Sequence, residues 1–308
     1  MVIDKAQSSI PQESNKFILI ALAWAGMLVV SSLPDILWAS LTGQVPAWLE
    51  WAKLISITAF LGLALVWKKL RPLWQYACIL LVFYLTYVVT QWIGNSLLWQ
   101  SRFGGEAVSF TLGFLGVFIL DSVIAVSILV ALWFMKRNRK SFFMTRGELN
   151  APIRPVHWLG IREGESWRTF GWIFAIAAAL AVMIPTVLVL KPTTETILKA
   201  SALLPSVILF AAINAFNEEV YYRVSLFSTL PEVIGRSQAQ LINITLFGLA
   251  HYLYGSPPGI IGFSMTGFLA FLIGKSMLET KGFAWPWFIH FLPDVIVFFS
   301  YALLFVQN

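Results

Sequence analysis

The sequence predicts an all-α, multi-pass transmembrane bundle of about nine helices, with eight as the alternative count. Of its 308 residues, 58% are hydrophobic and 12% are charged, whereas about 25% of the residues in a soluble domain are charged. The charged residues lie in clusters between apolar stretches of about twenty residues, the length of helix that crosses a hydrocarbon core. These stretches do not alternate with polar residues, so they indicate helices rather than barrel strands.

Nine apolar runs justify the helix count in chain order. They cover residues 17–33, 51–67, 73–93, 107–135, 169–190, 197–227, 238–254, 259–278 and 283–305. The chain then divides into a four-helix front part of unassigned role (1–135), a basic cytosolic linker (136–168) and a five-helix back part (169–308). We expect the linker to be a basic loop that sets topology, with contact to anionic lipid or to a substrate as the alternative.

Basic residues predict the orientation of the bundle. With the amino terminus in the cytosol and nine crossings, Lys53, Arg102, Lys191 and Lys199 lie outside, and the other 17 of the 21 Lys and Arg residues, Lys5 among them, lie inside. Positively charged residues favour the cytosolic side of a membrane. We therefore expect the cell (inner) membrane of a prokaryote, a cytosolic amino terminus and an outside carboxyl terminus.

Composition also excludes several classes of protein. The chain has a single cysteine, Cys78, which rules out an internal disulfide and a site with several cysteine ligands. Its net charge of +6 comes from basic residues at the ends of apolar runs, without interleaved base-stacking aromatics, so no nucleic-acid partner is expected. The expected partners are membrane lipid and a peptide or protein at the membrane.

Ionisable side chains inside the apolar runs are the main functional signal, because each is costly to place in a bilayer. Asp121 lies in the fourth run, where we expect a structural hydrogen-bonding role and keep a functional one as the alternative. The other ionisable residues of this kind lie in the back part and are Glu218, Glu219, His251, His290 and Asp294. Arg223 lies near the end of one of the same runs. Such a cluster predicts a wet site between helices rather than simple packing.

Helical spacing makes the two neighbouring glutamates unequal. Glu219 and Arg223 are four residues apart and share a helix face, in the order that favours an ion pair. Glu218 diverges from Glu219 by about 100° and shares its face with Asn214 instead. The spacing therefore predicts that Glu219 is paired and that Glu218 is available as a general base.

Three short motifs carry a resemblance to a known family. They are EEVYYR at 218–223, FGLAH at 247–251 and HFLPD at 290–294, and they match EExxxR, FxxxH and HxxxN/D in family order. The sequence resembles the CAAX protease and bacteriocin-processing (CPBP, or ABI domain) family of intramembrane glutamate proteases, similar to the Ras-converting CAAX endopeptidase. The resemblance covers about residues 200–301, a third of the chain.

The resemblance implies a role for each motif residue. Glu218 would activate water with help from His251, His290 and Asp294 would face the scissile carbonyl, and Glu219 with Arg223 would hold the helix. The related enzyme has asparagine where this chain has Asp294, and an ionised carboxylate would repel an oxyanion. Either burial keeps Asp294 protonated, or Asp294 orients His290 as an imidazolium donor in the manner of a hydrolase carboxylate, and we favour the second.

The expected function is an intramembrane endopeptidase that cuts a membrane-associated protein or peptide with glutamate-activated water. No cofactor is expected; a zinc protease with Glu218, His251 and His290 as ligands is one alternative, although HExxH is absent. A silent CPBP-like scaffold and a proton-coupled transporter are the others. The sequence leaves open the identity of the substrate and whether it is lipidated.

Overall fold

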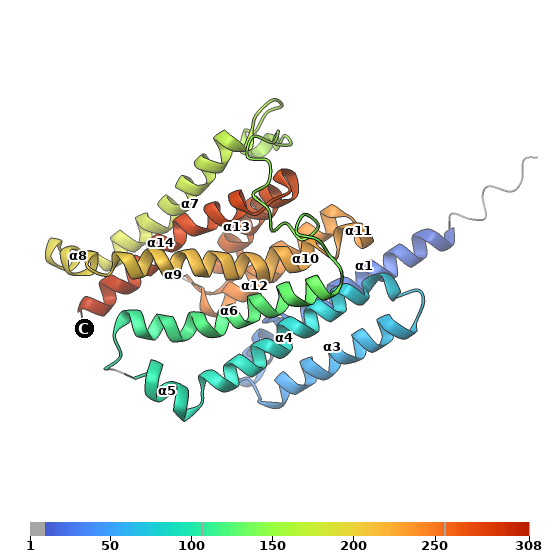
Figure 1. Ribbon diagram of the computed structural model, residues 1–308, viewed down its shortest axis with the longest axis horizontal. Helices are drawn as coiled ribbons and strands as arrows, with labels where there is room; N and C mark the ends of the chain where they lie inside the picture. Colours follow the sequence, from blue (N-terminus) through green and yellow to red (C-terminus); the bar gives the residue numbers. More distant parts are fainter. Residues whose placement is uncertain (1–9, 106, 256, 308) are drawn as a thin grey trace, which may run out of the picture. The chain divides into compact units, whose positions relative to one another are not determined.

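The computed structural model describes residues 10–105, 107–255 and 257–307 (Figure 1). The predicted cytosolic amino terminus, with Lys5, lies outside these residues. Within them the chain forms helices and no strand, and only isolated β-bridges join Pro152 to Ser166 and Val156 to Ile161. The all-α, multi-pass class is therefore confirmed.

The helices follow one another with short connections. The first group comprises α1 (Ile10–Val30), α2 (Leu33–Thr42), α3 (Trp48–Val66), η1 (Arg71–Leu73), α4 (Trp74–Gly94), α5 (Leu97–Phe103) and α6 (Phe110–Phe134). The second group comprises η2 (His157–Leu159), α7 (Trp167–Leu190), α8 (Thr194–Ser201), α9 (Leu204–Glu219), η3 (Val220–Val224), α10 (Ser225–Phe227), α11 (Pro231–Ile234), α12 (Arg236–Tyr254), α13 (Gly259–Thr280) and α14 (Ala284–Gln307).

The number of candidate membrane spans agrees with the lower expected count. Six helices of the described residues are long and apolar enough to cross a membrane, and the number rises to eight if α1 with α2 and α8 with α9–α11 each count as one bent span. The remaining expected span, the seventh in chain order at residues 238–254, is α12. It does not pass this test, because Arg236, Gln238, Gln240 and Asn243 make it too polar.

The chain forms two compact units that interleave along the sequence. The first comprises residues 1–85, 131–136 and 225–271, and the second comprises residues 86–130, 137–224 and 272–308. The sequential division into 1–135, 136–168 and 169–308 is a different one and stays a prediction. Of the six expected site residues, five lie in the second unit and His251 lies in the first.

In the first unit, α1 packs against α3, α11 and α12. The chain bends by 56° between α1 and α2. At this bend the buried Nζ of Lys53 donates to the carbonyl oxygen of Ser31 (3.1 Å) and pairs with Asp35. The ammonium group thus satisfies a carbonyl at the end of α1, where the helix has no backbone donor left to offer.

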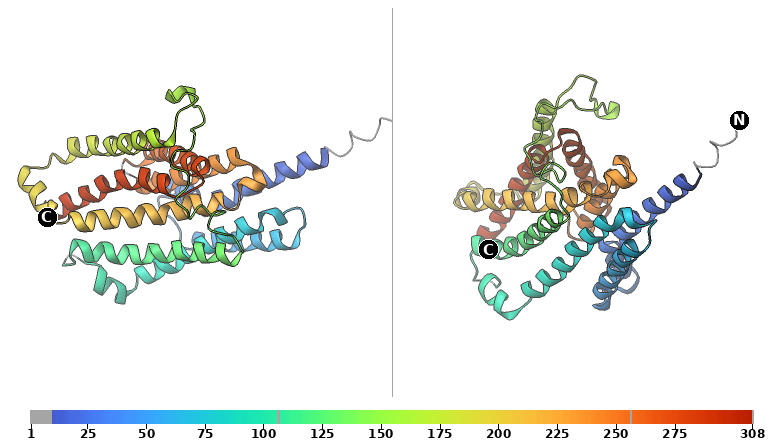
Figure 2. Two further views of the ribbon diagram at one scale, coloured as in Figure 1. Left: turned by 45° about the horizontal axis from the view of Figure 1, so that its top comes forward. Right: turned by 45° about the vertical axis from the view of Figure 1, so that its right-hand side comes forward.

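In the second unit, α14 packs against both α7 and α9. Figure 2 shows α6, α9, α14 and α7 running side by side. An aromatic cluster joins three of these helices: the ring of Phe118 on α6 stacks on Phe210 of α9, with centroids 5.4 Å apart, and also contacts Phe298 of α14. Large apolar rings therefore set the spacing of the helices that carry the candidate site.

The segment expected as a linker is docked against α13 and α14. The peptide N–H of Glu148 donates to Thr280 (2.8 Å), and the indole of Trp285 donates to the carbonyl of Leu149 (3.0 Å). Gly147 and Gly282 approach so closely that a Cβ on Gly282 would lie 2.2 Å from the Cα of Gly147. This part of the basic segment is thus a fixed support for the start of α14.

Candidate active site

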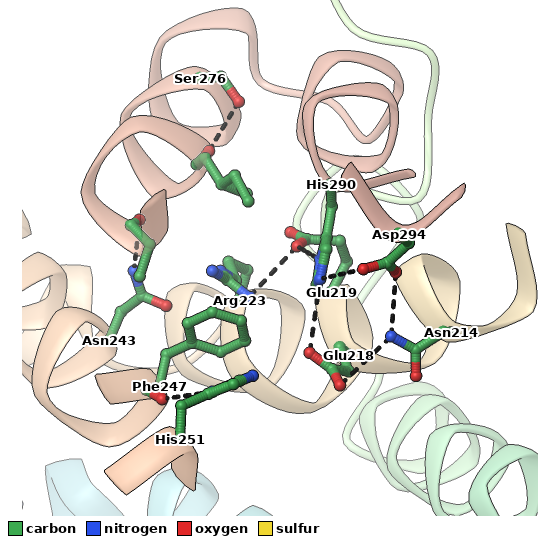
Figure 3. Close-up of polar contacts among 12 residues, drawn as sticks. Asn214, Glu218, Glu219, Arg223, Asn243, Phe247, His251, Ser276, His290 and Asp294 are labelled. Carbon is green, nitrogen blue, oxygen red and sulfur yellow. Dashed lines mark hydrogen bonds and ion pairs between the residues drawn. The ribbon is translucent and has the colours of Figure 1, made fainter. Parts of the chain in front are cut away.

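The candidate site begins where α9 changes into a π-helix. The α-helical pattern ends at Glu219, and residues 220–224 form η3, a single π-helical segment. Segments of this kind inside α-helices occur frequently at functional sites. Figure 3 shows the glutamate pair at this junction, with His290 and Asp294 of α14 above it.

Glu219 is the central residue of the cluster. Its Oε1 lies 3.2 Å from Nη1 of Arg223 and accepts a hydrogen bond from Nδ1 of His290 at 2.8 Å. The side chains of Glu219 and Arg223 are 0% exposed, and that of His290 is 4% exposed. The Glu219–Arg223 pair predicted from helical spacing is confirmed, and the structure adds His290 as a second partner.

Glu218 has a different environment from its neighbour. Its side chain is 22% exposed, and its Oε1 accepts a long hydrogen bond from the amide of Asn214 (3.4 Å). Its Oε2 lies 3.5 Å from Nε2 of His290 and, like Oε2 of Glu219, is buried without a hydrogen bond to any residue that the structure describes. Because the side chain of Glu219 is fully buried, Glu218 is the carboxylate of the pair that water can approach.

Asp294 lies on the Nε2 side of His290. Its Oδ2 accepts a hydrogen bond from Asn214 (3.0 Å), whereas its Oδ1 lies 3.8 Å from Nε2 of His290, within ion-pair distance but beyond hydrogen-bonding distance. The i, i+4 spacing places both residues on one face of α14, and the imidazole turns its Nδ1 across to Glu219 on α9. The hydrogen-bonded carboxylate is therefore Glu219, and the orienting role of Asp294 stays a prediction.

His251 lies on α12 in the first unit. Its Nδ1 is 2.9 Å from the carbonyl oxygen of Phe247, and the two rings are 4.5 Å apart. Because a carbonyl oxygen can only accept, Nδ1 carries the proton and Nε2 of the neutral ring is an acceptor. The role of His251 beside Glu218 stays a prediction.

Helix α6 contributes two residues that sequence reasoning did not place at the site. The hydroxyl of Tyr221 donates to the backbone carbonyl of Asp121, and the amide of Asn217 donates to Oγ of Ser122 (3.2 Å). The charges of Asp121 and Glu218 also interact. In the sequence, only Asp121 within an apolar run indicated that this helix could take part in the site. No residue pattern linked Asp121 to Asn217 or Tyr221.

The geometry offers little to a metal ion. Across residues 10–105, 107–255 and 257–307, no three His, Cys, Asp or Glu side chains form a group that could hold one. The expected absence of a cofactor stays a prediction, and we derive no step through zinc.

The comparison with protein-family models matches residues 200–296 to one family, described as type II CAAX prenyl endopeptidase Rce1-like. This part of the chain is therefore similar to the CAAX protease family that the sequence motifs indicated. No curated protein and no solved structure matches the chain. The match implies a peptidase whose substrate is a protein or peptide at the membrane, and the long apolar helices indicate an integral membrane protein.

The matched segment contains all six residues proposed from the sequence. It begins in α8 and ends within α14, two residues after Asp294. Helix α6 and the docked segment 145–151 lie outside it, although both contact elements that carry the site. The family match therefore includes the proposed site residues but not α6 or segment 145–151, which contact the helices that carry them.

Proposed function

We propose that this CAAX protease hydrolyses a peptide bond within the membrane with a water molecule activated by Glu218. The observation that carries the proposal is the contrast between two adjacent glutamates. Glu219 is fully buried and bound to Arg223 and His290, whereas the side chain of Glu218 is 22% exposed and has only a long hydrogen bond from Asn214 (3.4 Å). Of the two side chains, only that of Glu218 is reached by water, from which a general base takes its proton.

The reaction then follows from the placement of the side chains. Glu218 accepts one proton from water while the water oxygen forms a bond to the scissile carbonyl carbon. When the tetrahedral intermediate collapses, the C–N bond breaks and the proton held by Glu218 passes to the leaving nitrogen. His251, with an acceptor at Nε2, is the proposed assistant in the first step.

His290 is the proposed stabiliser of the developing oxyanion. Glu219 holds its Nδ1, so Nε2 faces Glu218 and Asp294 on the other side of the ring. A protonated ring would offer Nε2–H as a donor to negative charge on the substrate oxygen. The amide of Asn214 donates to both Glu218 and Asp294, and we assign it the task of holding these two carboxylates in place.

The proposed substrate is a membrane-associated protein or peptide with a prenylated CAAX end. This proposal rests on the name of the matched family, type II CAAX prenyl endopeptidase. A suitable probe is a fluorogenic peptide that ends in a farnesylated cysteine, two aliphatic residues and one terminal residue, called the prenyl probe below. The same peptide without the farnesyl group tests whether the lipid contributes.

The decisive experiment replaces Glu218 by glutamine, which keeps the shape and the hydrogen bond to Asn214 but cannot accept a proton. Turnover of the prenyl probe per folded enzyme should fall by about 10² to 10⁴ fold, the range ascribed to general-base catalysis. The control is Glu195→Gln, the same change at a side chain that is 77% exposed on α8. Cleavage at a near wild-type rate by the Glu218→Gln enzyme would refute the proposal.

We also propose the orientation that the basic residues predict, with the carboxyl terminus outside the cell membrane. It requires α12 to cross as a ninth span despite its polar residues. A reporter fused after Asn308 tests both points at once. Activity of a reporter that works only in the cytosol would contradict this orientation.

A further inference from the structure

Helix α6 is a mainly apolar helix of 25 residues with two adjacent polar residues near its middle. Asp121 and Ser122 are adjacent there, and both contact the segment that carries the glutamate pair. The match to the CAAX protease family begins at residue 200, so α6 lies outside it. A polar pair at this depth is costly in a membrane and calls for a function.

The two contacts flank Glu218 on both sides. Asn217, one residue before it, donates to Oγ of Ser122 (3.2 Å), and Tyr221, three residues after it, donates to the backbone carbonyl of Asp121. Asn217 is 1% exposed and Tyr221 is 9% exposed, so both bonds are shielded from water. The turn that bears Glu218 is thereby fixed to α6 at two points.

The position of these bonds coincides with the change from α-helix to π-helix. Tyr221 belongs to the π-helical segment, while Asn217 belongs to the last turn of α9. A π-helical turn is rare and widens the helix locally, so its register depends on contacts from outside the helix. The hydroxyl of Tyr221 supplies such a contact within the turn itself.

Other contacts also join α6 to α9. Phe118 of α6 stacks on Phe210 of α9 at 5.4 Å, and Phe114 contacts the same ring at 5.7 Å. Thr111 and Ser206 form another hydroxyl contact between the same two helices (2.7 Å). Because aromatic packing already joins α6 to α9, we look for the role of the hydrogen bonds at Asp121 and Ser122 in the turn that they contact.

We propose that the Asp121–Ser122 pair of α6 is a positioning element of the CAAX protease, which holds the glutamate-bearing turn in register through Asn217 and Tyr221. The pair acts on the reaction through Glu218 and touches no reacting atom. This inference rests on the proposed function of Glu218. It adds residues outside the matched segment 200–296 to the machinery of the site.

The test removes each bond separately and measures kcat and KM with the prenyl probe. Ser122→Ala removes the acceptor of Asn217, and Tyr221→Phe removes the donor to Asp121. Each should lower kcat by about tenfold and change KM by less than about twofold, because the turn is misplaced while the substrate surface is kept. Ser122→Thr, which retains the hydroxyl, should restore kcat.

The matched control is Thr111→Ala, which removes a hydroxyl contact between the same helices. Thr111 lies 11 residues before Ser122, or roughly 16 Å along α6 at 1.5 Å per residue. This variant should leave kcat unchanged. If Ser122→Ala and Tyr221→Phe behave like Thr111→Ala, with kcat per folded enzyme unchanged, the pair only packs helices and the inference is overturned.

A second measurement needs no substrate. The rate at which dicyclohexylcarbodiimide modifies Glu218, followed by mass spectrometry, should change by about threefold or more in Ser122→Ala and Tyr221→Phe and stay constant in Thr111→Ala. Unchanged rates in all three variants would overturn the inference. The Glu218→Gln variant separates the two proposals: if it cuts the prenyl probe normally, the proposed function fails, whatever the α6 variants do.

Discussion

The buried Glu219–Arg223–His290 arrangement allows a prediction in which stability and activity separate. Glu219 Oε1 lies 3.2 Å from Arg223 and 2.8 Å from His290, and Glu219 and Arg223 are 0% exposed. Removing one member of a buried ion pair costs about 3–5 kcal/mol, because the other charge loses its partner. We therefore expect Glu219→Gln to lower the free energy of unfolding by about that amount.

A double replacement distinguishes the structural part of this role from the chemical part. Glu219→Gln combined with Arg223→Met replaces the pair with neutral groups of similar volume, and such replacements are often neutral for stability. The double variant should regain all but about 1 kcal/mol. It should not regain activity, because His290 still lacks the carboxylate that holds its Nδ1, and turnover should stay at least about 10² fold below wild type.

The control is the exposed pair Glu195–Lys199, which has the same i, i+4 spacing on α8 and a distance of 2.8 Å. With side chains 77% and 59% exposed, Glu195→Gln should change the free energy of unfolding by only about 0.5 kcal/mol or less. Unfolding is followed by titration with a denaturing detergent in mixed micelles, and cleavage of the prenyl probe is measured per folded protein. Recovery of activity together with stability in the double variant would refute the orienting role of Glu219.

Three further predictions follow from other contacts. Asp294→Asn should be mild, within about tenfold of wild-type turnover, because an amide oxygen can still accept from Asn214 and His290 loses no hydrogen bond; a loss as large as that of Glu218→Gln would show that the charge of Asp294 is required. Hydrolysis should survive chelation of divalent metals, since no three potential metal ligands converge in the described residues. Loss of activity that zinc alone restores would instead indicate that Glu218, His251 and His290 are zinc ligands. Gly282→Ala should destabilise the protein by about 1–3 kcal/mol, because its Cβ would lie 2.2 Å from the Cα of Gly147; unchanged thermal stability would argue against the docking of segment 145–151.

Contacts along a single helix could be predicted from the sequence. The i, i+4 spacing gave the partners of both glutamates, Arg223 for Glu219 and Asn214 for Glu218, and both contacts are present. Helical geometry fixes such neighbours without knowledge of the rest of the fold. The all-α class followed in the same way from the length of the apolar runs.

Contacts between helices could not be predicted from the sequence. The partner of His290 is Glu219 on α9 rather than Asp294 on its own helix, and this depends on how α9 and α14 pack. The contact of Tyr221 with α6 depends in addition on the π-helical turn, which no residue pattern announces. Spacing rules describe one helix face, whereas these bonds are decided by which faces meet.

The segment matched by the CAAX protease family is contacted at several points by residues outside it. The start of α14, six residues before His290, is held by Leu149 through the indole of Trp285 and by the close approach of Gly147 to Gly282. The last turn of α13 is held from outside as well, since the indole of the buried Trp167 donates to Glu279 (2.9 Å).

The glutamate-bearing turn of α9 has its own external support in Asp121 and Ser122 of α6. In a bilayer, helices gain little from hydrophobic contact with one another, so such polar bonds and close packing decide their register. On the proposed positioning role of α6, the placement of Glu218 against His290 depends on residues far outside 200–296. Variation in α6 and in the segment 145–151 should tune the rate of a CAAX protease whose motif residues stay the same.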